Sequence, residues 1–211
     1  MAIEKGKLQI KNLEQEDIKQ VVNIHRTSFE NSRSTKLGPP FLFRLYSWYF
    51  LHQPELSFVA LYNDEIVGFV TGTLGWGGAR KRFKFSLLQI ILGLLKNPKL
   101  IITKEMYEEA SNFIKAFINR DQNSQKNMKD ISTKATLDSI AVIPKARGLK
   151  VGQNLISSFE DAAEKQGADY VALGVEYQNI AARYLYEKCG WSLFKENEDL
   201  NSASYQKYFS N

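Results

Sequence analysis

The residues best suited to chemistry lie where a buried strand gives way to a helix, in the segment 140–156 (IAVIPKARGLKVGQNLI). Pro144 marks the end of the strand, and a glycine-bearing turn then leads into the helix. Free N–H groups and the positive end of the helix dipole converge at such a turn, which therefore attracts anions. Gly148 and Gly152 let a ligand approach the backbone, and Arg147 adds a planar cation suited to phosphate oxygens.

A second segment, 179–191 (NIAARYLYEKCGW), is expected to be a helix that ends at Gly190, a residue type favoured just beyond helix C-termini. Both segments resemble motifs of the GNAT acetyltransferase superfamily. The sequence RGLKVG at 147–152 is similar to the cofactor signature R/Q-x-x-G-x-G/A. The second segment is similar to N-x-x-A-x-x-L-Y-x-K-x-G-F/W, with Trp191 in the last position.

The resemblance implies acetyl-CoA or a longer acyl-CoA as co-substrate, and no metal. In the family the turn and the helix N-terminus hold the pyrophosphate of coenzyme A, and the pantetheine lies along the preceding strand like an added strand. The implied cofactor-binding residues are Ile140, Ala141, Val142, Arg147, Gly148, Leu149, Lys150, Val151, Gly152 and Asn179. Lys150 stands where the family usually has glycine, and we expect it in the first helical turn, where φ need not be positive.

The resemblance also implies direct acyl transfer in a ternary complex. The residue matching the family's general acid is Tyr186, which would protonate the departing thiolate. A phenol suits this role because it is neutral at pH 7 and donates one proton. A tyrosine buried in the core is the alternative interpretation. The family polarises the thioester carbonyl with a backbone N–H, here near Ala141 or Val142.

The general base is less well defined by the sequence. Many relatives place a glutamate where this chain has Gly174, and others place a carboxylate where it has Thr136. Asp138 lies two residues after Thr136, so on a regular strand the two share a face. A carboxylate in an apolar strand predicts either a base or substrate anchor, or a structural hydrogen bond. Glu176 and a water relay are the alternatives.

Three other features have weaker claims to chemistry. His25 on an apolar helix face is typical of a hydrogen-bonded core histidine, although it could touch the substrate. Cys189 occupies a variable position of the second motif, so a covalent acyl-cysteine is disfavoured. The aromatic run 41–50 is more typical of a core than of a ligand wall, although the first two helices shape the acceptor pocket in the GNAT family.

The elements around these motifs predict an α/β fold of the α+β type. It is a GNAT-like, mixed and mostly antiparallel central sheet with helices on both faces. Strands are expected at 7–13, 56–62, 66–74, 135–143, 170–175, 191–196 and 203–209. Helices are expected at 14–29, 41–51, 148–166 and 179–188, with a loop at 30–36. The second and third strands should form a hairpin around Asn63-Asp64-Glu65.

Residues 1–211 are expected to form a single domain, with residues 80–134 as a helical insertion and polar connector after that hairpin. The insertion opens with a basic cluster, Arg80-Lys81-Arg82. An apolar helix at 83–95 and a second helix at 98–118 should follow. The remainder, 119–134, is polar enough to serve as a connector.

Composition limits the class of protein. The net charge of +5 suits an anionic cofactor, and the scattered acidic residues do not favour nucleic acid as a partner. One cysteine and the absence of an apolar N-terminal leader predict a cytoplasmic protein. The most apolar stretch, 85–102, is too short and too polar at its flanks to cross a bilayer. Its apolar helix predicts a homodimer.

The acceptor is expected to be a small molecule with a primary amine. The pattern at 24–46 (IHRTSFENSRSTKLGPPFLFRLY), followed by a long insertion, is similar to GNAT members that acylate nucleotide-linked amino sugars. Two alternatives remain open. One is a protein or peptide N-acetyltransferase, and the other is a non-catalytic module that binds acyl-CoA or a membrane surface.

Overall fold

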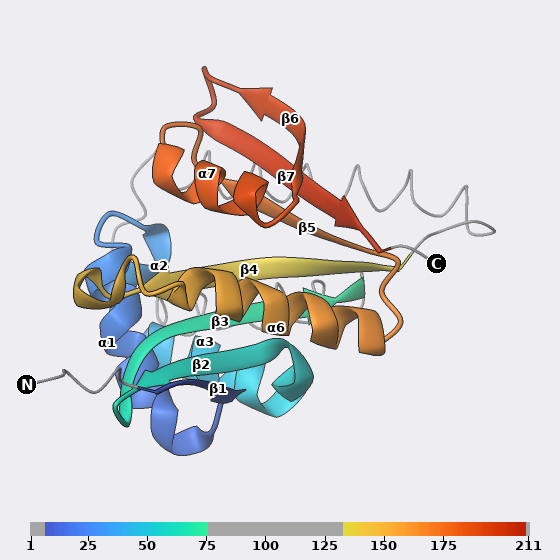
Figure 1. Cartoon of the computed structure of the whole chain (residues 1–211). Coiled ribbons are helices and arrows are strands. Elements are labelled where there is room, and N and C mark those ends of the chain that lie inside the picture. The colour runs from blue at the N-terminus through green and yellow to red at the C-terminus, as the bar shows by residue number, and fades with distance from the viewer. Residues whose placement is uncertain (1–6, 76–132, 210–211) are drawn as a thin grey trace, which may run out of the picture. The chain divides into compact units, whose positions relative to one another are not determined.

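The computed structural model describes residues 7–75 and 133–209, which contain a seven-stranded mixed sheet (Figure 1). The spatial order of the strands is β1-β2-β3-β4-β5-β7-β6. Within it β4 and β5 run parallel, and every other neighbouring pair is antiparallel. The strands are β1 (Leu8–Asn12), β2 (Ser57–Tyr62), β3 (Glu65–Leu74), β4 (Lys134–Val142), β5 (Tyr170–Val175), β6 (Ser192–Asn197) and β7 (Ser202–Tyr208). The predicted mixed, mostly antiparallel sheet is confirmed.

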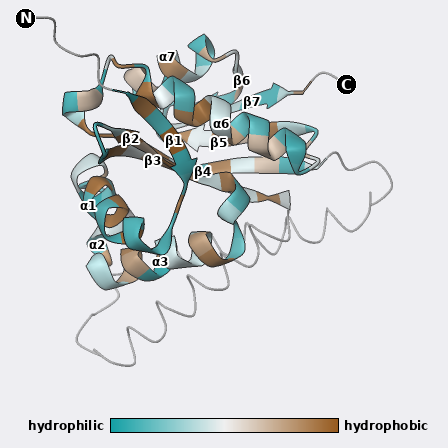
Figure 2. Cartoon of the chain, turned by 60° about the horizontal axis from the view of Figure 1, so that its bottom comes forward, coloured by the Kyte–Doolittle hydropathy of each residue, from teal (hydrophilic) through white to brown (hydrophobic). Residues whose placement is uncertain are grey.

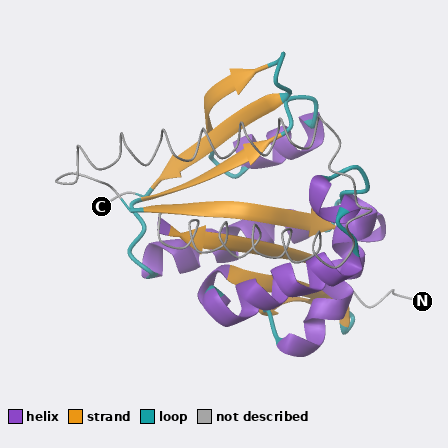
Figure 3. Ribbon diagram, turned by 180° about the vertical axis from the view of Figure 1, so that it is seen from behind, coloured by secondary structure: helices purple, strands orange, loops and turns teal. Residues whose placement is uncertain are grey.

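Helices cover both faces of this sheet, as Figures 1 and 3 show. One face carries α1 and α3, and the other carries α6 and α7. The helices are η1 (Gln15–Asp17), α1 (Ile18–Ser28), α2 (Arg33–Lys36), α3 (Pro39–His52), η2 (Pro54–Leu56), η4 (Pro144–Ala146), α6 (Val151–Lys165) and α7 (Ile180–Lys188). The short helix α2 corrects the expected loop at 30–36. The hydroxyl of Ser32 accepts the Thr35 N–H and so supports its first turn.

The hairpin of β2 and β3 turns at Asn63 and Asp64, whose φ angles are 51° and 61°. Two successive residues in the left-handed region form the turn that matches the twist of paired strands. Glu65, which was expected in the turn, is the first residue of β3 and pairs with Tyr62. The predicted hairpin is therefore confirmed with a two-residue loop.

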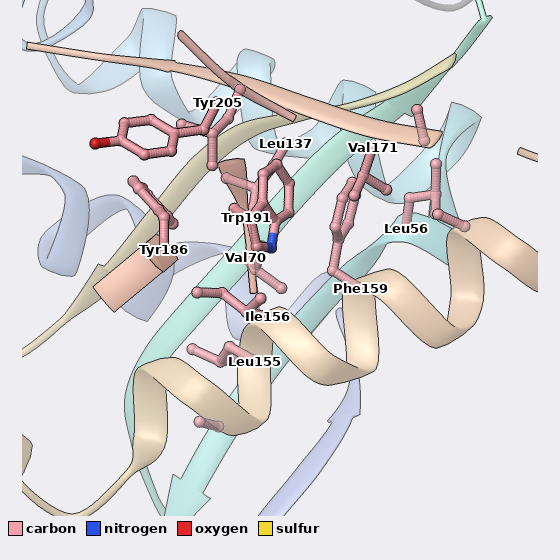
Figure 4. Close-up of a cluster of buried hydrophobic side chains, with 14 of the residues drawn as sticks. Leu56, Val70, Leu137, Leu155, Ile156, Phe159, Val171, Tyr186, Trp191 and Tyr205 are labelled. Atoms are coloured by element: carbon pink, nitrogen blue, oxygen red, sulfur yellow. The ribbon is translucent and has the colours of Figure 1, made fainter. Parts of the chain in front are cut away.

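The helix α6 lies across the sheet and buries one continuous face against it. Its buried apolar residues recur at helical spacing, while the residues between them, except the buried Glu160, are half-buried or exposed. Figure 2 shows hydrophobic and hydrophilic residues alternating around α6, and Figure 4 shows its inward side chains among those of the strands. A Cβ on Gly72 would lie 2.3 Å from the Phe159 ring, so this glycine on β3 lets the helix pack closely.

A buried carboxylate joins α6 to the end of α7 and to β7. Glu160 accepts a hydrogen bond from the indole N–H of Trp191 and pairs with Lys207 at 2.6 Å. The same lysine donates to the carbonyl of Cys189 at 3.0 Å. Because a buried carboxylate is costly without partners, these bonds fix α7 in place relative to α6.

No helix within 7–75 and 133–209 is long and apolar enough to cross a membrane. The apolar stretch 85–102 and all but Thr133 and Lys134 of the predicted insertion lie outside the described residues. β3 and β4, which flank that segment, pair directly in the sheet. The insertion itself stays a prediction.

Lys150 does not occupy the first helical turn as expected. It is the N-cap of α6, with φ 60° and ψ 13°, in the left-handed region. Its carbonyl accepts the Asn154 N–H at 3.0 Å, so helical hydrogen bonding begins at this residue. A side chain with a Cβ is strained in this conformation by about 1 kcal/mol, which gives a physical reason for glycine at this position.

Replacing Lys150 by glycine should therefore stabilise the fold. We expect Lys150→Gly to raise the free energy of unfolding by about 0.5–1 kcal/mol, measured by urea denaturation. Lys150→Ala is the matched control, because it removes the same charge and side chain but keeps the Cβ that causes the strain. Equal stabilities of the two variants would contradict a strained Lys150.

Candidate functional site

The strands β4 and β5 pair over only part of their length. The ladder joins Lys134–Leu137 to Tyr170–Leu173 and ends there. β4 continues from Asp138 to Val142 paired with β3 on its other side. Figures 1 and 3 show the two strands diverging beyond this point. In the described part of the chain, this half of β4 has no strand along its second edge.

The direction of the backbone groups on this edge follows from one hydrogen bond. The Ile143 N–H donates to the Val67 carbonyl of β3 at 2.9 Å. Because successive residues of an antiparallel strand alternate in direction, the Ala141 N–H also points to β3. The N–H groups of Ile140 and Val142 point to the opposite edge, which an extended ligand can pair with as an added strand.

Asp138 interrupts the regular alternation of β4. Leu137 pairs with Gly72 and Ser139 pairs with Thr71, so Asp138 has no partner residue in the register of β3. This is a β-bulge, in which one strand carries an extra residue. The prediction that Asp138 shares a face with Thr136 assumed a regular strand, and that argument fails at the bulge. The bulge instead puts Asp138 at the point where β4 and β5 separate.

The turn before α6 presents several backbone amides together. Gly148 has φ 83°, and no atom of the described chain lies within 4 Å of where its Cβ would be. Among the described residues, no hydrogen-bond acceptor is found for the N–H groups of Gly148, Lys150, Val151 and Gly152. Successive amides in a turn with left-handed residues form a concave anion site, and the helix dipole adds to it.

Charged side chains complete this turn. Arg147, Leu149 and Lys150 are exposed. Lys145 is held by Glu65 at 2.6 and 2.8 Å, which ties the 3₁₀ turn η4 to the β2–β3 hairpin. The structure therefore places the sequence-predicted residues 147–152 in one basic, amide-rich turn, in which the Val151 side chain is buried.

The two sequence motifs are in direct contact. A Cβ on Gly152 would lie 3.0 Å from Leu185 of α7, so the first turn of α6 packs closely against that helix. Asn179 is the N-cap of α7, and its side-chain oxygen accepts the Ala182 N–H at 3.2 Å. Its amide nitrogen has no partner in the described residues and remains a donor for a ligand.

Tyr186 lies on the inner face of α7. Its side chain is 5% exposed and packs against the rings of Trp191 and Tyr205, at centroid distances of 6.0 and 5.9 Å (Figure 4). Burial raises the pKa of Tyr186 to about 12, and the nearby Cys189 adds to this effect. The phenol is therefore fully protonated at neutral pH, and its ring is also part of the hydrophobic core.

The other residues considered for catalysis differ in burial and in hydrogen bonding. His25 is 3% exposed and bonded to Tyr46 and Ser34, as expected of a core histidine. Burial raises the pKa of the Cys189 thiol, which makes it a poor nucleophile. Glu176 is exposed. Within the described residues no cluster of His, Cys, Asp and Glu could hold a metal ion.

The sequence and the fold were compared with known proteins. Residues 105–191 match the acetyltransferase (GNAT) family. No curated protein matches the chain in sequence. Solved structures of similar fold include PH1933 from Pyrococcus horikoshii OT3, which is 18% identical with a TM-score of 0.60; the match covers 97% of this chain and 100% of that one.

Two further structures of similar fold contain ligands. The PaiA N-acetyltransferase from Thermoplasma acidophilum, solved with coenzyme A, is 14% identical with a TM-score of 0.57, over 96% of this chain and 99% of that one. Naa50 from Arabidopsis thaliana, solved with the bisubstrate analogue CoA-Ac-MVNAL, is 15% identical with a TM-score of 0.57. The match covers 96% of this chain and 99% of that one. The family match spans residues 105–191 and the shared fold spans nearly the whole chain, so the chain is similar to GNAT acetyltransferases in both respects.

Proposed function

We propose that the protein transfers an acyl group from acetyl-CoA or a longer acyl-CoA to a primary amine. The observation that carries this proposal is the unpaired edge of β4, which leads directly into the amide-rich turn at 147–152. An extended pantetheine on the Ile140 and Val142 amides would bring its phosphates to that turn. Coenzyme A has both parts, an extended amide-bearing arm and a pyrophosphate.

The same arrangement assigns roles to the other binding residues. The amides of Gly148, Lys150 and Gly152 would hold the pyrophosphate, together with the guanidinium of Arg147. Asn179 would donate its free amide hydrogens to a carbonyl of the pantetheine. The Val142 or Ile140 amide would polarise the thioester carbonyl, since both point to the ligand edge.

For the chemical step we propose Tyr186 as the general acid. Its motif is fixed against the cofactor turn by the contact between Leu185 and Gly152. The raised pKa keeps the proton on the phenol until a thiolate forms beside it. Asp138, at the separation of the strands, would anchor the acceptor ammonium or act as its base.

The acceptor that we propose is the amine of a nucleotide-linked amino sugar. The similarity of residues 24–46 to enzymes of that kind supports it. A peptide N-terminus is the second candidate, because Naa50 was solved with a peptide-bearing bisubstrate analogue. UDP-glucosamine and a peptide with a free N-terminus are therefore the first two acceptors to compare, each with acetyl-CoA.

Cofactor binding tests the assignment of the turn. Isothermal titration with acetyl-CoA, longer acyl-CoAs and free CoA should show binding that Arg147→Glu weakens by at least about tenfold, because a charge-assisted contact becomes a repulsion. Lys165→Glu is the control, since it makes the same charge change at the far end of α6. Equal weakening by both variants would point to general electrostatics and contradict the assigned turn.

The turnover rate tests the assignment of Tyr186 as the general acid. Tyr186→Phe keeps the buried ring but removes the proton, so kcat should fall about 100-fold, while the Kd of acetyl-CoA changes less than about twofold. Tyr184→Phe is the control, because Tyr184 lies on the same helix and is 64% exposed. An unchanged kcat in Tyr186→Phe would leave Tyr186 as a core residue only.

A further inference from the structure

A continuous chain of hydrogen bonds links β4 to the segment between α1 and α2. The Tyr46 hydroxyl has Ser139 of β4 as one partner and lies 2.6 Å from Nδ1 of His25. Nε2 of His25 lies 2.9 Å from the Ser34 hydroxyl. That hydroxyl lies 3.0 Å from the hydroxyl of Ser32. Five side chains, from β4, α3, α1, α2 and the residues just before α2, thus form one connected path.

All donors in this path can point the same way. The Tyr46 phenol shares a hydrogen bond with Ser139, and in a bond between two hydroxyls Ser139 can be the donor. Burial lowers the pKa of His25 to about 4, so the imidazole is neutral at pH 7. A neutral imidazole that accepts from Tyr46 at Nδ1 must donate from Nε2, here to Ser34. In that arrangement each group accepts one hydrogen and donates one.

The two ends of the path lie in different surroundings from its middle. Tyr46 and His25 are 0% and 3% exposed, while Ser139, Ser34 and Ser32 are only partly buried. Ser139 follows the Asp138 bulge, where β4 loses the partner strand β5. The path therefore starts beside the proposed site of acyl transfer and crosses the dry interior to the α1–α2 segment.

We propose that Ser139, Tyr46, His25, Ser34 and Ser32 form a proton relay that removes the proton lost by the acceptor amine. This inference rests on the proposed function. The amine nitrogen bonds to the thioester carbon, the carbon–sulfur bond breaks, and the sulfur takes a proton from Tyr186. The amine proton passes to the Ser139 oxygen, and one proton moves along each link until solvent takes one from Ser32. Solvent then returns one proton to the Tyr186 phenolate, which restores the starting state.

This relay supplies the general base for the acceptor amine, which the sequence alone does not identify. No link requires a stable alkoxide, because every hydroxyl gains a proton as it loses one. His25 is the member that can accept at one nitrogen and release at the other, which is the usual role of imidazole in proton transfer. Asp138 is then left to hold the acceptor, which reacts as the neutral amine.

Two substitutions interrupt the relay while they preserve packing. Tyr46→Phe removes the hydroxyl but keeps the ring that packs on Phe69 and His25. His25→Gln can accept from Tyr46 and donate to Ser34, but an amide does not pass protons between its two ends. Tyr49→Phe is the control, because it removes a hydroxyl from an equally buried ring on the same helix.

The first measurement is kcat per folded protein, with acetyl-CoA and whichever of UDP-glucosamine and the peptide reacts faster. The solvent deuterium isotope effect on kcat and the Kd of acetyl-CoA are measured for the same variants. We expect both Tyr46→Phe and His25→Gln to lower kcat at least about tenfold. The isotope effect should change, and the Kd should stay within about twofold. Tyr49→Phe should match the parent protein in all three quantities.

Other outcomes distinguish the possible failures. Normal kcat in His25→Gln would show that the hydrogen bonds serve structure alone, and it would overturn the relay. An unchanged isotope effect in Tyr46→Phe would also overturn it. If the parent protein binds acetyl-CoA yet acylates neither acceptor, the proposed function fails and the relay fails with it.

Discussion

The site depends on the separation of two parallel strands. β4 and β5 share hydrogen bonds only as far as Leu137 and Leu173, and the Asp138 bulge follows at once. Backbone groups that lose a strand partner need another acceptor or donor, because an unpaired buried group costs free energy. The second half of β4 therefore carries N–H groups that a ligand can bind, in the middle of the sheet rather than at its outer edge.

Contacts elsewhere in the fold position the helices and side chains that surround this separation. Glu160, bonded to Trp191 and Lys207, fixes α7 relative to α6. Gly152 lets the N-terminus of α6 pack against Leu185, which brings the proposed anion-binding turn beside the proposed acid. On the opposite face, Tyr46 joins α3 to β4 through Ser139. The proposed cofactor contacts and the proposed proton path thus meet at β4 from its two sides.

Much of this fold could be predicted from the sequence, because strand and helix periodicities and the Asn63-Asp64 turn are local signals. The left-handed Lys150 and the bulge at Asp138 could not, since both depend on how neighbouring elements pair. The bond between His25 and Tyr46 joins residues 21 positions apart, and no local pattern indicates it. The acceptor, the homodimer and the cytoplasmic location stay predictions, and the apolar helix 83–95 lies outside the described residues.

Amide hydrogen exchange by NMR, with and without coenzyme A, tests the central claim most directly. The backbone N–H groups of Ser139 and Ala141 point to β3 and should exchange slowly in both states. The amides of Ile140, Val142 and the turn 148–152 should slow only when coenzyme A is bound. Coenzyme A binding that leaves Ile140 and Val142 unchanged would show that the cofactor does not lie along β4, and would contradict this account of the site.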